Sequence, residues 1–146
     1  MDQALSAAIT CHRNGELPRA KRLYQAVLND APTQPIANHN LALVFIHEGR
    51  LKESLFHFKA ATDSDPTIEQ HWRSFFTALI ELRQFSDAGA LILSMETHAE
   101  LHNAVLDMRS ELTASLSRLE PAEEELEDII LAFKNARYEE AKLASS

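Results

Sequence analysis

The sequence predicts an all-α chain, a right-handed α-solenoid of helix-turn-helix repeats with one long helix inserted. Residues recur at a spacing of 34, so that Gly15 is matched by Gly49 and Pro32 by Pro66. Within each block, apolar residues recur at steps of three and four, which is the period of an α-helix. Glycine and proline are few, 3 and 5 of 146 residues, which disfavours a turn-rich β fold. Repeats of this length typically stack into extended binding surfaces rather than forming one globular core.

The first block, residues 1–34, is expected to contain two helices. The first helix should run to about Asn14, and Gly15 then allows the left-handed backbone that closes it. The second helix is predicted over 17–29 and should end before Pro32, because proline cannot continue the helix.

The second block, residues 35–68, repeats this layout. Pro35 suits the first position of a helix, where the missing N–H costs nothing, and Gly49 should close that helix. A second helix is predicted over 51–62. One position in each second helix carries a small residue that lets the two helices of a pair approach closely: Ala20, Ser54 and Ala88.

The third block, residues 69–97, departs from the pattern towards its end. Thr67 and Gln70 have the spacing of a capping box at its start. Trp72 is expected to pack between helices. Arg83, however, stands where the other blocks have glycine, and Glu100 stands where they have proline.

These blocks resemble tetratricopeptide repeats over about residues 1–96. The matching residues are Gly15, Ala20, Tyr24 and Pro32 in the first block, Leu41, Phe45, Gly49, Phe58, Ala61 and Pro66 in the second, and Trp72 and Ala88 in the third. Asn38 takes the tryptophan position of the second block. The resemblance implies a scaffold that binds a protein or peptide, with no cofactor and no catalytic activity of its own.

After the third block the repeat phase is lost. Residues 98–119 are predicted to form one long helix whose apolar stripe either covers the flank of the third block or forms a homodimer seam. Residues 121–146 are expected to form a partial fourth repeat, with Pro121 opening its first helix. Because a half-repeat leaves an apolar face uncovered, we expect the chain to be the N-terminal piece of a longer protein.

Composition and charge restrict the classes of partner. The net charge of -8 falls entirely on residues 74–146, which disfavours binding to phosphate backbones. No apolar run is long enough to span a membrane. The start of the chain lacks the basic region of a secretory signal, and Cys11 is the single cysteine, so a reducing, cytoplasmic location is expected.

The candidate binding residues lie on the first helix of each repeat, at positions whose phase predicts that they do not pack inward. Such residues should line the concave face of the stack and form either a peptide groove or plain solvated surface. They are His12, Arg13, His39, Asn40, Leu43, His47, Arg73, Thr77 and Glu81.

A subgroup of these repeats grips the C-terminal carboxylates of chaperones with lysine and asparagine side chains. Only Asn40 matches that pattern here; the other four positions hold Leu5, Ile9, Gln70 and Ser74. Without the cations, charge-assisted hydrogen bonds to a carboxylate are lost, so we expect no binding of such tails.

Metal and catalytic sites are not expected. His98 and His102 have i, i+4 spacing, but Ala99 stands where a zinc protease motif needs glutamate. The main functional hypothesis is therefore an interaction scaffold. Two alternatives remain open: a self-assembly module acting through the stack ends or the long helix, and the non-catalytic front of an enzyme, similar to bacterial proteins with repeats ahead of a glycosyltransferase or sulfotransferase domain.

Overall fold

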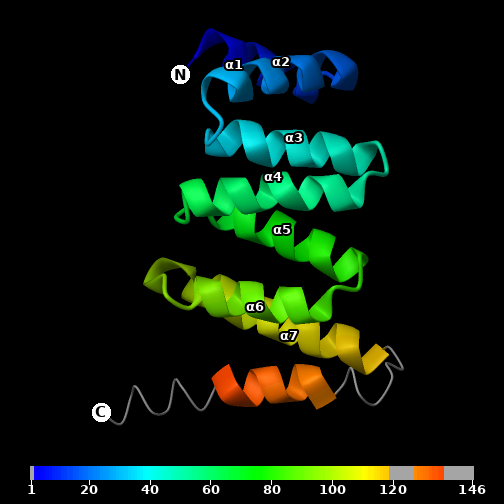
Figure 1. Cartoon of the computed structure of the whole chain (residues 1–146), viewed down its shortest axis with the longest axis vertical. Coiled ribbons are helices and arrows are strands. Elements are labelled where there is room, and N and C mark those ends of the chain that lie inside the picture. The colour runs from blue at the N-terminus through cyan, green and yellow to red at the C-terminus, as the bar shows by residue number, and fades with distance from the viewer. Residues whose placement is uncertain (1, 119–126, 137–146) are drawn as a thin grey trace. The chain divides into compact units, whose positions relative to one another are not determined.

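A computed structural model describes residues 2–118 and 127–136, and every regular element in these ranges is a helix. The all-α prediction is therefore confirmed (Figure 1). The chain divides into two compact units, residues 1–78 and residues 79–146, and each unit is described by itself. None of the described helices combines the length and apolarity needed to cross a membrane.

The first unit is a series of antiparallel helices joined by short turns. Helix α1 packs against α2 and α3 against α4, while α2 also contacts α3, so the two hairpins are stacked (Figure 1). The helices are α1 (Gln3–Arg13), α2 (Leu17–Asp30), α3 (Pro35–His47), α4 (Leu51–Ser64) and α5 (Glu69–Glu81), the last belonging to this unit through residue 78.

The helix starts follow from local chemistry. The carboxylate of Asp2 accepts a hydrogen bond from the backbone N–H of Ala4 at 3.2 Å and caps α1. The side-chain oxygen of Gln34 accepts from the N–H of Ala37 at 2.7 Å, and Pro35 begins α3 as predicted. Each cap satisfies a backbone donor that the first turn of a helix leaves without a partner.

The three turns that close α1, α3 and α5 share one geometry at a spacing of 34 residues. Gly15 has φ +81°, Gly49 +76° and Arg83 +59°. Each of these residues donates its N–H to a carbonyl three residues earlier at 2.9–3.1 Å, as in a helix that ends in the left-handed conformation. The turn of the third block therefore keeps its shape although arginine replaces glycine.

Replacing Arg83 with glycine should raise the free energy of unfolding by about 1 kcal/mol, because a side chain in the left-handed region clashes with the backbone and glycine does not. Chemical denaturation followed by circular dichroism measures the change. Arg83→Ala is the control, since it removes the arginine but keeps the strained Cβ. Equal stability of the two variants would contradict this explanation.

Two apolar clusters form the core of the first unit. One lies among α1, α2 and α3 and contains Leu5, Ala8, Tyr24 and Leu41. The other joins α3, α4 and α5 through Ala42, Phe58 and Ala78, with Phe75 packed against it. The small residues Ala20 and Ser54 are fully buried, as close approach within the hairpins requires, and so is Ala88 in the second unit.

Asn38 and Trp72, which occupy equivalent positions, make equivalent hydrogen bonds. The Asn38 amide donates to the carbonyl of Pro32 at 3.0 Å, and the Trp72 indole N–H donates to the carbonyl of Pro66 at 2.9 Å. Both side chains are buried and tie the start of a first helix to the proline that closes the preceding block. An amide thus replaces the indole as a donor without loss of this contact.

The second unit begins within α5 and contains α6 (Phe85–Met95), a 3₁₀ turn η1 (Ala99–Leu101), α7 (His102–Arg118) and helical residues 127–136. The prediction of one helix over 98–119 is wrong at its start. His98 has φ -112° and ψ 103°, because the chain must reverse after α6 ends, and the α-helix begins only at His102. The two histidines therefore do not share a helical face.

The predicted apolar stripe is buried at Leu101 of η1 and at Val105, Met108 and Leu112 of α7, each at most 3% exposed. Within the second unit α7 packs against α6, and a homodimer seam stays a prediction. Pro121 and most of the predicted partial fourth repeat, residues 121–146, lie outside the described residues.

Candidate functional site

The candidate surface, called the inner face below, consists of the predicted residues of α1, α3 and α5 within the first unit. Arg13, His47 and Thr77 are exposed, whereas His12, Asn40, Leu43 and Arg73 are half-buried, and His39 is buried at 7% exposure. Glu81 belongs to the second unit and is not part of this surface.

All of these residues were predicted not to pack inward, and for two of them that prediction is wrong. His39 is buried and Leu43 packs against the cluster formed by Ala42, Phe58 and Ala78. The reason is that α3 has neighbours on several sides, so residues all around it are covered. A helix buried in this way has no polar face from which solvent exposure could be read.

A connected set of side-chain hydrogen bonds runs across the inner face, here called the polar row. It links α5 to α3, α2 and α1. Its members are Gln70, Ser74, His39, Asn40, Tyr24 and His12.

The α5 end of the polar row fixes the protonation of His39. His39 Nδ1 lies 3.2 Å from Asn40 Oδ1, which can only accept, so Nδ1 carries the proton. His39 Nε2 lies 2.9 Å from Ser74 Oγ and must then accept the hydroxyl proton. Gln70 donates its amide to Ser74 Oγ at 3.2 Å. His39 is thus held as one neutral tautomer with both ring nitrogens satisfied.

The α1 end continues in the same direction. Burial raises the pKa of Tyr24, and the hydrogen-bonding side chain of Asn40 opposes that rise. The Tyr24 hydroxyl lies 3.1 Å from His12 Nδ1 and donates a hydrogen bond to it. Neighbouring side chains in the polar row restrain one another's rotamers. The row therefore holds polar groups from four helices in defined orientations.

His71 adds an aromatic partner to the polar row. Its ring stacks on that of His39 with centroids 4.4 Å apart and an angle of 23° between the planes. His71 is only 4% exposed, and within the part of the chain that the structure describes its buried Nδ1 has no hydrogen-bond partner. Because the rings lie so close, protonation of both at once would place two positive charges in direct repulsion.

Burial lowers the pKa of all three histidines of this region below the usual value of 6.5. Loss of solvation is the main cause for His12, and His47 adds repulsion. For His39, burial outweighs the hydrogen bond to Asn40 that favours protonation. The pKa of His71 falls to about 4 through burial and the neighbouring His39, with Asp65 opposing the change. His12, His39 and His71 are therefore held neutral at physiological pH.

Two cations adjoin members of the polar row in the sequence, Arg13 after His12 and Arg73 before Ser74. Arg73 forms an ion pair with Glu69 one turn earlier at 3.1 Å, and its backbone carbonyl accepts the hydroxyl of Thr77 at 2.9 Å. Arg13 is exposed at the end of α1. These side chains can meet acidic groups of a partner at the rim of a contact surface.

The sequence analysis did not identify His71 and named Tyr24 only as a residue that matches the repeat motif. Ser74 and Gln70 entered only as residues replacing the cations of a carboxylate-binding site. One signal was available: Asn40 and Ser74 are 34 residues apart and therefore occupy equivalent positions in consecutive repeats. Two hydrogen-bonding residues in one phase indicate a polar contact along the stack.

Replacing Tyr24 with phenylalanine should lower the free energy of unfolding by about 1–2 kcal/mol, since the fully buried ring is kept but the hydroxyl that joins Asn40 to His12 is lost. Urea denaturation at neutral pH measures the loss. Thr33→Val, which removes an exposed hydroxyl, is the control and is expected to have little effect. A Tyr24 variant as stable as the natural chain would show that the polar row is not a connected unit.

Comparison with known proteins identifies the architecture. No family model matches the chain, and no curated protein matches it in sequence. The structure is similar to the type III secretion translocator chaperone SycD of Yersinia enterocolitica, with a TM-score of 0.64, 13% identity, and coverage of 80% of this chain and 83% of that one.

Two tetratricopeptide-repeat domains are also similar. The Sgt2 domain of Aspergillus fumigatus gives a TM-score of 0.61 at 20% identity, covering 83% of this chain and 85% of that one. The TPR2B domain of yeast Sti1 gives 0.64 at 15% identity, covering 80% and 94%. The helical hairpins, the 34-residue turn geometry and these similarities agree: the chain has the fold of tetratricopeptide-repeat proteins.

Proposed function

We propose that the chain is an interaction scaffold and that the inner face of its first unit binds a segment of a partner protein. The observation that carries this proposal is the polar row, which holds hydrogen-bonding groups from four helices in fixed positions beside the exposed Arg13 and Thr77. Groups that are already ordered lose little conformational entropy when a ligand arrives.

The chemistry of the polar row suits an extended peptide. Gln70 is exposed, and Ser74, Asn40 and His12 are half-buried, so their remaining donors and acceptors can meet the backbone N–H and C=O groups of a ligand. The half-buried Arg73 can approach an acidic side chain. Main-chain hydrogen bonds of this kind give affinity with modest dependence on peptide sequence.

Structurally similar proteins support the class of ligand. SycD has been solved in complex with a peptide of the translocator YopD, and the TPR2B domain of Sti1 in a complex with pHsp70. For this chain we propose a different preference. Leu5 and Ile9 occupy positions where clamps for acidic C-termini carry lysine and asparagine, so such tails should not bind tightly.

The test is a peptide selected against the whole chain from a random display library, with its affinity measured by fluorescence anisotropy. Thr77→Trp places a bulky side chain on the inner face and should weaken binding at least about tenfold through steric exclusion. Gln25→Trp is the matched control, because Gln25 is also an exposed, uncharged residue but lies on α2.

Loss of binding in Thr77→Trp alone supports the proposal. Equal binding by both variants would contradict it, as would equal loss, because the ligand would then not be using the inner face. Circular dichroism of both variants confirms that each remains folded.

A further inference from the structure

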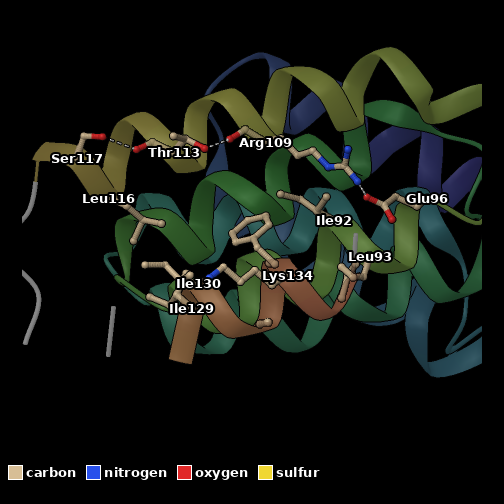
Figure 2. Close-up of a pocket in the computed structure, with 14 residues that line it drawn as sticks. Ile92, Leu93, Glu96, Arg109, Thr113, Leu116, Ser117, Ile129, Ile130 and Lys134 are labelled. Atoms are coloured by element: carbon tan, nitrogen blue, oxygen red, sulfur yellow. Dashed lines mark hydrogen bonds and ion pairs between the residues drawn. The ribbon is translucent and has the colours of Figure 1, made fainter. Parts of the chain in front are cut away.

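A cavity of about 490 Å³ lies inside the second unit, apart from the inner face. It is bounded by α6, α7 and helical residues 127–136 (Figure 2). A volume of this size is typical of sites for small molecules. No residue of the polar row contributes to it, so it calls for a separate explanation.

The walls of the cavity are predominantly apolar. Ile92, Leu116, Ile129 and Phe133 line its interior. Leu93 and Ile130 also line it and remain 39% and 42% exposed, so apolar surface continues to the mouth. Thr113 and Ser117 donate their hydroxyls to backbone carbonyls of α7 at 2.9 Å and are therefore already satisfied (Figure 2). Apolar surface of this extent favours an apolar occupant over water.

Gly89 lies inside α6 and lines the cavity. A Cβ added at this position would meet no atom within 4 Å. Glycine in a helix interior is unfavourable relative to alanine, and neither an unusual φ nor a close contact explains its presence here. Its effect is to widen the cavity at a cost to helix stability.

The charged groups at the cavity favour an anionic end on the occupant. Arg109 is engaged in an ion pair with Glu96 (Figure 2). In the range that the structure describes, Lys134 lines the cavity without such an ion pair. An ammonium group beside an apolar space can bind a carboxylate whose hydrocarbon portion fills that space.

A partner helix fits this space less well than a small molecule. One turn of a helix about 10 Å wide and 5.4 Å high occupies roughly 420 Å³, so the cavity would hold a single turn. A flexible hydrocarbon chain can instead place most of its length inside, where each buried methylene contributes to affinity.

We propose that the cavity binds a long-chain carboxylate, with the hydrocarbon chain along Ile92, Leu116 and Phe133 and the carboxylate at Lys134. The inference does not depend on the proposed function, because the inner face and the cavity belong to different units.

The experiment titrates the full chain with dodecanoate and with dodecanol, at an ionic strength that screens the net charge of -8. Calorimetry gives the affinities, and NMR shifts locate the ligand. We expect dodecanoate to bind at one site and to bind more tightly than dodecanol. Gly89→Leu should weaken dodecanoate about tenfold by displacing about two methylenes of the ligand, without loss of thermal stability.

Matched variants separate the cavity from its surroundings. Ala90→Leu adds the same side chain at the next, exposed residue of α6 and should leave binding unchanged. Lys134→Met should remove the preference for dodecanoate over dodecanol, whereas Arg118→Met, at an exposed cation of α7, should keep it. The proposal is overturned if dodecanoate does not bind, if Ala90→Leu weakens it as much as Gly89→Leu, or if Lys134→Met keeps the preference.

Discussion

Replacing Phe58 with alanine is expected to lower the free energy of unfolding by about 3–5 kcal/mol, the largest loss for a single residue of the first unit. Phe58 is fully buried in a cluster with Ala42 and Ala78, in which it is the only large buried side chain. Its ring also stacks on Phe75 with centroids 6.1 Å apart and lies 5.7 Å from His39. The substitution therefore removes one large buried side chain from the cluster that joins α3, α4 and α5.

Urea denaturation at neutral pH, with helicity followed by circular dichroism, measures this loss. Phe56→Ala is a control on the same helix, since Phe56 is 74% exposed and its removal should change stability by no more than about 0.5 kcal/mol. If both variants lost the same stability, Phe58 would not be the residue that joins the two repeats.

Acidification is expected to destabilise the chain strongly between pH 6.5 and about 4. In the unfolded chain His71 titrates near 6.5, whereas in the folded chain its pKa is about 4. Between these values the unfolded state binds more protons, so stability is complete above pH 6.5 and falls as the pH approaches 4. His71 alone contributes up to about 3 kcal/mol to this change.

His12, His39 and His57 act in the same direction, because burial lowers the pKa of each. His39 and His71 are coupled more closely than the others, since a proton on one ring faces the stacked ring of the other at 4.4 Å. Protonation of one ring therefore disfavours protonation of the other, and the two histidines titrate as a coupled pair.

His71→Phe tests the assignment. The variant keeps an aromatic ring against His39 but removes the titrating group, so the stability difference between neutral and acidic pH should shrink by up to about 3 kcal/mol. His102→Phe, at an exposed histidine of the second unit, should keep the full pH dependence. An unchanged pH dependence in His71→Phe would show that other groups cause the acid sensitivity.

The sequence predicts the helices well where a turn residue marks each end. Gly15 and Gly49 adopt the positive φ expected of them, and the helix from Leu51 ends two residues beyond the predicted Thr62, at Ser64. The prediction was wrong at His98, because an unbroken apolar stripe does not reveal where a chain reverses. The geometry there depends on the end of α6 at Met95, which has no sequence marker comparable to glycine.

The candidate site was only partly predictable. The positions of His12, Asn40 and Arg73 within the 34-residue repeat placed them on one surface. That reasoning assumed that each helix has one buried and one exposed side. His39 violates that assumption because α3 is surrounded, and His71 was missed because its burial comes from stacking on His39 rather than from the core. Such contacts between consecutive repeats depend on side-chain direction, which the spacing of residues does not fix.

The most direct test of the central claim is to map a selected peptide onto the chain by NMR with isotopically labelled protein. The proposed function predicts that the largest shifts occur at His12, Asn40, Ser74 and Thr77, with small changes on the exposed residues of α2 and α4. Shifts concentrated on the exposed residues of α2 and α4, or confined to residues 79–136, would contradict binding at the inner face.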